Sequence, residues 1–312
     1  MTVLTASTSS TSPAGQAASG LSIRTILFAL STGLCLQVLA LLTLSGGDPV
    51  DALCYWLTNP AQPYNRAEYQ FAYSPVAAQL ISPLLWWPFP LFALLFRVIE
   101  VASLVFLTGP LAGALIFTTP VASEVNAANI NLVIAVIMVL GFRWPALWAI
   151  PLLTKPTMGI GLVWFLLRRE WRKAALPIAI AGGLALGSFL LNQRVWFEYV
   201  AFLTTGTAQD GGWPYPYSIW TRLPISLLLI VWGARTNRPW TVALASALAL
   251  PRLYYQSPAI LIALVPLVPW LGRLVVPWAR RIARLEELFP ERPMTAGGGE
   301  MRLQAEARAG TL

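Results

Sequence analysis

Long apolar stretches, separated by short polar ones, run through most of this chain. The first covers residues 21–44 and is long enough to cross a bilayer, because a membrane-spanning helix needs about 20 apolar residues. It is longer than the apolar core of a cleaved signal peptide, so it predicts an uncleaved anchor helix. Residues 1–20 before it are rich in Ser, Thr, Ala and Gly, and we expect them to be disordered.

Further apolar segments follow the first and also predict helices. They cover about residues 73–86, 91–108, 110–125, 127–140, 146–167, 174–191, 219–233, 240–253 and 258–271. Several are shorter than a full span, and the chain has 25 prolines, many of them inside these segments. Broken helices are tolerated at membrane depth where they line a cavity enclosed by protein. The pattern therefore predicts an all-α, polytopic transmembrane bundle of about ten spans.

Two polar, aromatic-rich loops, 45–72 and 192–218, interrupt the apolar pattern. The distribution of Arg and Lys orients them, because positive residues favour the cytoplasmic side. With a cytoplasmic N-terminus, the basic clusters after the sixth, eighth and tenth crossings all fall inside, and Arg143 is the one flanking charge that falls outside. We therefore expect a transmembrane domain over 21–273 with both polar loops external, and a basic cytoplasmic tail over 274–312.

Composition supports a membrane protein and argues against a nucleic-acid-binding one. Hydrophobic residues make up 57% of the chain and charged residues 11%, well below the roughly one quarter usual for soluble domains. The mean hydropathy is +0.64. The short alternating segments of a transmembrane β-barrel do not occur. The net charge of +8 comes from arginines grouped at the ends of predicted helices, which is typical of topology signals and anionic-lipid contacts.

The chain contains no histidine, which restricts its chemistry. A Ser–His–Asp triad and histidine-based metal sites are excluded. Proton transfer must then rest on Asp, Glu, Lys, Tyr or water. Cys35 falls inside the first apolar segment and Cys54 after it, so we expect two small apolar side chains rather than a disulfide.

Several short motifs occur in a characteristic order. They are D-x-x-x-Y-W (Asp51, Tyr55, Trp56), Y-S-P-V-A-A-Q-L-I-S-P-L (73–84), N-x-N-L (Asn129, Asn131, Leu132), F-R-W-P-A-L-W-A-I-P-L-L-T-K-P-T (142–157) and R-R-E-W-R (168–172). In this order and spacing the chain resembles glycosyltransferase family 87, the bacterial polyprenyl-phosphate-sugar-dependent mannosyltransferases of the GT-C class. The similarity runs from about residue 21 to residue 273.

The resemblance implies a multi-spanning enzyme of the bacterial plasma membrane. Such an enzyme takes mannose from polyprenyl phosphate at the outer face, inverts the anomeric centre, and uses no cofactor. It implies a glycolipid or glycan acceptor and a catalytic aspartate in the first external loop, where Asp51 matches. Two departures are visible: Ala128 stands where family members often have Gly, and the C-terminal end is shorter than in many members.

Asp51 is the candidate base that would take the proton of the acceptor hydroxyl. The neighbouring rings of Tyr55 and Trp56 could stack on a sugar. Alternatively, Asp51 caps a short interfacial helix, since Asp is a favoured N-cap residue. Asp48 is the alternative base, although it precedes Pro49 in a pairing typical of turns. The two aspartates have no third ligand nearby, so the sequence predicts no metal site.

Lys155 is the first candidate to bind the phosphate of the lipid donor. An intramembrane lysine is costly and marks a functional site by default, and a leaving phosphate needs a cation or N–H donors. Arg252 and Arg66 rank next, because an arginine fork suits phosphate. Arg222 lies in a similar position. Each of these arginines is equally well explained as an interfacial anchor.

Asn129 and Asn131 stand with Glu124 near an expected helix break. They either bind the donor or bridge helices by hydrogen bonds. Arg97 and Glu100, three residues apart, are expected to pair with each other.

Two other classes of function remain open. A lipid or small-solute transporter or flippase would also show broken helices and intramembrane charges. No repeat of the hydropathy pattern supports that reading. A non-catalytic membrane protein is the third possibility. The sequence alone favours the enzyme, with a polyprenyl-phosphate sugar, an acceptor and membrane lipids as partners and no nucleic acid.

Overall fold

A computed structural model describes residues 22–47, 49–64, 71–204, 217–275 and 278–289. Their regular structure is helical, with no strand in these ranges. The elements are α1 (Ile23–Leu44), α2 (Val50–Trp56), α3 (Pro75–Ile81), η1 (Ser82–Trp86), α4 (Phe89–Thr108), η2 (Gly109–Leu111), α5 (Ala112–Leu115), α6 (Thr119–Ala127), α7 (Asn131–Leu140), η3 (Pro145–Trp148), α8 (Ala149–Thr154), η4 (Pro156–Gly161), α9 (Leu162–Leu167), α10 (Trp171–Leu191), α11 (Gln193–Thr204), α12 (Ile219–Thr236), α13 (Trp240–Leu248), η5 (Ser257–Ala263), α14 (Leu264–Leu267), α15 (Pro269–Val275), α16 (Trp278–Ile282) and α17 (Leu285–Leu288).

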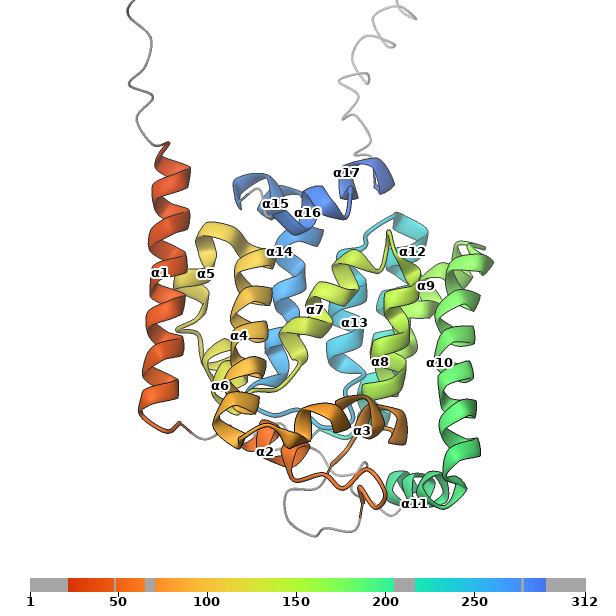
Figure 1. Ribbon diagram of the computed structural model, residues 1–312. Coiled ribbons are helices and arrows are strands. Elements are labelled where there is room, and N and C mark those ends of the chain that lie inside the picture. Colours follow the sequence, from red (N-terminus) through yellow and green to blue (C-terminus); the bar gives the residue numbers. More distant parts are fainter. Residues whose placement is uncertain (1–21, 48, 65–70, 205–216, 276–277, 290–312) are drawn as a thin grey trace, which may run out of the picture.

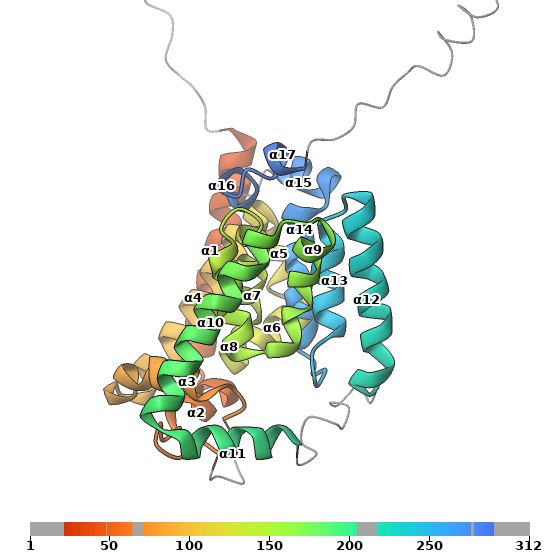
Figure 2. The ribbon, with the colours of Figure 1, turned by 90° about the vertical axis from the view of Figure 1, so that its right-hand side faces the viewer.

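The longer helices stand side by side, and short helices close both ends of the bundle (Figure 1). One end carries α2, α3 and α11, and we call it the α2 end. The other carries α15, α16 and α17, and we call it the α16 end. Figure 2 shows the same division after a quarter turn.

Three helical runs are long and apolar enough to cross a membrane: α1, Phe89–Leu115 through α4 and α5, and α10. The pair α6 and α7 would make a fourth span, but the two helices are bent by 108° at the break between them. The all-helical architecture is confirmed for the described residues, whereas the predicted count of ten spans is not confirmed. The expected disorder of residues 1–20 and most of the expected 274–312 tail lie outside the described residues.

Proline accounts for much of the difference in span count. The segment expected as one helix over 146–167 consists of four short elements, η3 to α9, and Pro156 opens the third of them. Proline has no backbone N–H and fits the first turn of a helix better than its interior. The helix expected over 73–86 is also short. It begins at Pro75 and lies across the α2 end (Figure 1).

α7 forms the centre of the apolar core. It packs against α4 and η5, and its Leu132, Ile134 and Met138 are fully buried. By contrast, α1 and α10 present many leucines on the outside of the bundle, as expected of helices that face lipid.

Arg97 and Glu100 do not pair with each other, contrary to expectation. The Arg97 guanidinium donates hydrogen bonds to the carbonyls of Leu42 (2.9 Å) and Asn126 (3.1 Å). The Glu100 carboxylate instead accepts from the amides of Leu132 (3.3 Å) and Val133 (3.4 Å), at the start of α7. Arg97 thus ties α1 to α6, and Glu100 satisfies amides that have no partner within the helix.

The close approach of α12 and α13 gives a test of the packing. A Cβ added at Gly233 would lie 2.7 Å from the Cβ of the buried Thr241. We expect Gly233→Ala to destabilise the protein by about 1–3 kcal/mol, because overpacking forces a backbone shift. Thermal unfolding in detergent measures this change.

Gly183→Ala is the matched control. Gly183 also lies within a helix, but an added Cβ there meets nothing within 4 Å. This change should be neutral or stabilise by up to about 1 kcal/mol, since alanine favours helix. Equal effects of the two changes would contradict the packing described for α12 and α13.

Candidate active site

The break between α6 and α7 creates a polar site inside the α2 end of the bundle. Ala128 adopts φ 55° and ψ 50°, and the chain turns there by 108°. This left-handed conformation costs an L-residue roughly 1–2 kcal/mol and suits glycine better. The turn places Asn129 and Asn131 directly after the break, where both are buried.

Glu124 fixes the orientation of Asn131. One carboxylate oxygen accepts from the Asn131 backbone amide (2.5 Å), and the other accepts from its side-chain Nδ2 (2.8 Å). Because Nδ2 faces Glu124, the side-chain Oδ1 points the other way. Glu124 is fully buried, so these bonds replace the hydration that its carboxylate has lost.

Lys155 meets this arrangement from the opposite side. Its Nζ donates to Asn131 Oδ1 (2.5 Å) and to Asn129 Oδ1 (3.5 Å), and it lies 5.9 Å from the centre of the Tyr73 ring. The sequence placed Lys155 in the middle of a helix. It lies instead at the junction of α8 and η4, where Pro156 interrupts the helix. Both asparagines therefore hold the cation, and they also bridge helices.

Tyr55 and Tyr73 complete the wall of the site. Their hydroxyls are 2.7 Å apart, and they lie 3.2 Å and 3.3 Å from Asn129 Oδ1. Burial raises the pKa of Tyr55 well above its usual range, helped by the nearby charge of Tyr73 and then of Asp51, so this hydroxyl remains a donor. The Tyr55 ring packs against Phe71 and Phe96 and is 5% exposed. It therefore offers no free face for sugar stacking, and we correct that expectation.

Asp51 lies at the outer edge of these residues. The N-cap position of α2 belongs to Pro49, and Asp51 sits in the first turn, so it is not the cap residue that the sequence allowed. Its Oδ2 accepts a hydrogen bond from Gln256 Nε2 (3.5 Å). Its charge acts through space on Lys155 and on Glu124. Asp51 is partly exposed, whereas Glu124, Asn129 and Asn131 are buried.

The loop that carries Gln256 also carries Arg252. Arg252 Nη1 lies 3.4 Å from the Tyr254 hydroxyl. Among the residues that the structure describes, no hydrogen bond joins Arg252 to Lys155. Its role in binding the donor remains a prediction. Arg222 holds this loop in place by donating to the carbonyls of Leu248 (2.7 Å) and Leu250 (2.8 Å). Arg222 is therefore a structural residue rather than a phosphate ligand.

An aromatic layer from α11 covers the site. Tyr64 stacks on Tyr199 and Phe202, with ring centres 5.4 Å and 5.6 Å apart, and its hydroxyl donates to the Tyr73 carbonyl (2.6 Å). The amphipathic helix α11 thus covers the side of the site next to Tyr73, at the α2 end (Figure 2).

The structure brings five of the predicted site residues into one cluster: Asp51, Tyr55, Asn129, Asn131 and Lys155. Asp48 and Arg66 lie outside the described residues. Sequence reasoning missed Tyr73, although it opens a quoted motif, and it also missed Gln256. Within the described ranges, no three Cys, Asp or Glu side chains gather as metal ligands.

Comparison with known proteins finds no match, either among family models, among curated proteins or among solved structures. The function therefore has to be argued from the residues and their geometry.

The coupling of Lys155 to Glu124 predicts non-additive stability effects. Lys155→Met should cost about 3 kcal/mol, because it leaves buried carboxylates without their cation. Glu124→Gln should also destabilise the protein, because it leaves the Lys155 cation without this nearby carboxylate. In the double variant the loss should be smaller than the sum by at least about 1 kcal/mol. Denaturant unfolding of all four proteins in detergent measures the cycle, and additive losses would show that the two charges do not interact.

Proposed function

We propose that this protein is an integral-membrane glycosyltransferase. It transfers a sugar, mannose in the resemblance stated above, from a polyprenyl-phosphate donor to a hydroxyl of a glycolipid or glycan. The observation that carries the proposal is the placement of one carboxylate, Asp51, and one cation, Lys155, in a single polar site at one end of an apolar bundle.

The proposed chemistry is one displacement with inversion. The acceptor oxygen attacks the anomeric carbon while the bond from that carbon to the phosphate oxygen breaks. Asp51 takes the acceptor proton, a contribution of roughly 10²–10⁴-fold in rate. Polyprenyl phosphate leaves with the bonding electron pair, and Lys155 stabilises the developing negative charge.

The buried groups support these two roles. Glu124 and Asn131 hold Lys155 in one position, so little reorganisation is needed when charge develops on the phosphate. Asp51 is partly exposed, which suits a base that must reach an acceptor arriving from outside. The protonated Tyr55 hydroxyl adds a hydrogen-bond donor beside them.

The charge distribution supports the proposed orientation. The arginine-rich junction of α9 and α10, the end of α12, and α16 all lie at the α16 end (Figure 1). Positive residues favour the cytoplasmic side, so the α2 end would face outward. In this proposal the chain is a GT-C enzyme of the bacterial plasma membrane with both termini in the cytoplasm.

One observation favours transport as a second candidate. The bent pair α6–α7, with the buried Glu100 and Glu124 and the half-buried Lys155 around it, is a feature that secondary transporters share. A transporter or flippase would move labelled lipid-linked sugar across liposomes without forming a new glycosidic bond. A non-catalytic membrane protein would do neither.

The base is tested by sugar transfer in liposomes. Radiolabelled polyprenyl-phosphate-mannose and a membrane-lipid acceptor pool are incubated with wild type and with Asp51→Asn, and labelled product is counted. We expect the mutation to lower transfer at least about 100-fold. Glu198→Gln is the matched control, since this acid lies at the same end but pairs with Arg194 on α11 (2.8 Å), and it should retain activity.

Two results would contradict parts of this proposal. Transfer that survives Asp51→Asn would move the base elsewhere, with Asp48 the next candidate. Transfer from a GDP-sugar, with the lipid-linked sugar ignored, would overturn the donor class.

A further inference from the structure

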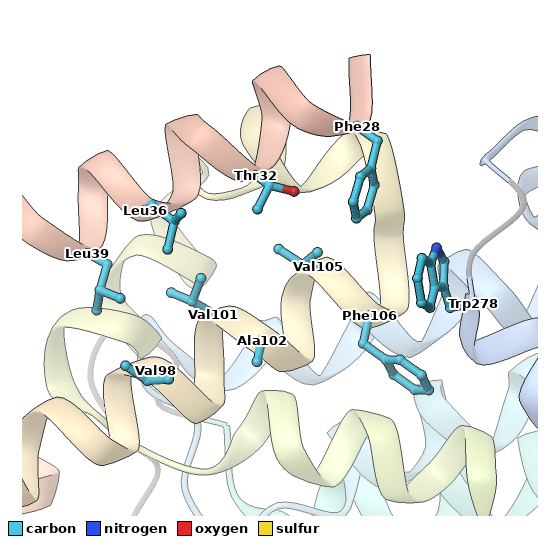
Figure 3. A pocket seen from close by; sticks show the side chains of 10 residues that line it. All are labelled: Phe28, Thr32, Leu36, Leu39, Val98, Val101, Ala102, Val105, Phe106 and Trp278. Atoms are coloured by element: carbon cyan, nitrogen blue, oxygen red, sulfur yellow. The ribbon is translucent and has the colours of Figure 1, made fainter. Parts of the chain in front are cut away.

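An apolar groove of about 390 Å³ runs along the outside of the bundle between α1 and α4 (Figure 3). Leu36 and Leu39 of α1 form one wall, and Val98, Val101 and Val105 of α4 form the other. The groove is open to the surroundings of the bundle, where the two apolar helices face lipid. It lies away from the polar site described above.

The packing of α1 keeps this groove open. On its other side α1 is held tightly to α5, because Ser31 Oγ accepts a hydrogen bond from the Gly113 amide (2.6 Å). A Cβ added at Gly113 would lie 2.9 Å from Ser31 Cα, so the two helices are too close at this contact to accommodate a larger residue. On the groove side, Ala102 of α4 is small and exposed and leaves room.

Aromatic rings close the groove at the α16 end. Phe28 of α1 stacks on Trp278 of α16, with ring centres 6.1 Å apart and planes 16° apart (Figure 3). From Phe28 to Leu39 the groove follows α1 for about 16 Å, at 1.5 Å per residue. That length matches one leaflet, which is half of the roughly 30 Å hydrocarbon core.

Two exposed arginines flank the closed end. Arg24 lies four residues before Phe28, and Arg281 lies three residues after Trp278, so each shares a helix face with its aromatic residue. Neither forms an ion pair within the part of the chain that the structure describes. The neighbouring Arg280 differs, because it is buried and donates to the Pro266 carbonyl (3.0 Å).

We propose that this groove binds one acyl chain of an anionic phospholipid from the leaflet at the α16 end, with the phosphate between Arg24 and Arg281. The apolar walls match the chain, the length matches one leaflet, and the arginines match a negative headgroup. Such a lipid would fill the groove between α1 and α4, while the Ser31–Gly113 contact holds another side of α1 against α5. The proposal requires only that the bundle lies in a membrane, and it does not depend on sugar transfer.

Native mass spectrometry of the full chain tests the proposal. Delipidated protein in detergent is titrated with phosphatidylglycerol and, separately, with phosphatidylcholine of the same acyl chains. We expect wild type to retain one phosphatidylglycerol molecule preferentially. Ala102→Trp fills the groove and should abolish this retention. Ala179→Trp, at an exposed alanine of the lipid-facing helix α10, should preserve it.

Arginine variants test the headgroup without changing the core. Arg24→Gln and Arg281→Gln should each lower the preference for phosphatidylglycerol about fivefold. Arg172→Gln, at an exposed arginine of the same end, should leave it unchanged. Equal retention of lipid by Ala102→Trp and Ala179→Trp would overturn the site. Equal binding of both phospholipids by wild type, or displacement of phosphatidylglycerol by polyprenyl phosphate, would overturn the assigned occupant.

Discussion

The hydrogen bond between Lys155 and Asn131 is the interaction on which the rest of the α2 end depends. It joins the junction of α8 and η4 to the start of α7. Through Asn131 it reaches Glu124 on α6, and the charge of Lys155 also interacts with Glu100 on α4. An ammonium group that is half-buried among polar side chains is stable only when it is hydrogen-bonded, so four elements must keep their relative positions. The same requirement fixes the position of a cation that interacts electrostatically with Asp51.

The break after α6 makes this arrangement possible. A continuous helix through residues 119–140 would hold Glu124 and Asn131 two turns apart, about 10 Å along the axis, and would turn Asn129 away from both. The left-handed turn at Ala128 instead folds α7 back, so that the side chain of Asn131 lies between Glu124 and Lys155. The turn also exposes the first amides of α7, and the Glu100 and Glu124 carboxylates bind them. Backbone strain at one residue is thereby offset by several buried hydrogen bonds.

The sequence predicted which polar residues lie together better than it predicted how the apolar segments divide into helices. Intramembrane charges and amides are expensive in lipid, so Lys155, Asn129 and Asn131 stood out, and the structure places them together. Apolar length, by contrast, could not distinguish a full span from short helices joined at prolines, which is why ten spans were expected. Periodicity also could not show that Arg97 and Glu100 turn to different backbone partners, because those partners are distant in sequence.

The central claim is that one carboxylate and one cation perform a single displacement. The most direct measurement is the anomeric configuration of the product, read by NMR after transfer of ¹³C-labelled mannose from polyprenyl phosphate by the wild-type protein in liposomes. The proposed mechanism predicts a glycosidic product whose configuration is inverted relative to the donor. A retained configuration, or the absence of product from folded protein supplied with donor and acceptor lipids, would contradict it.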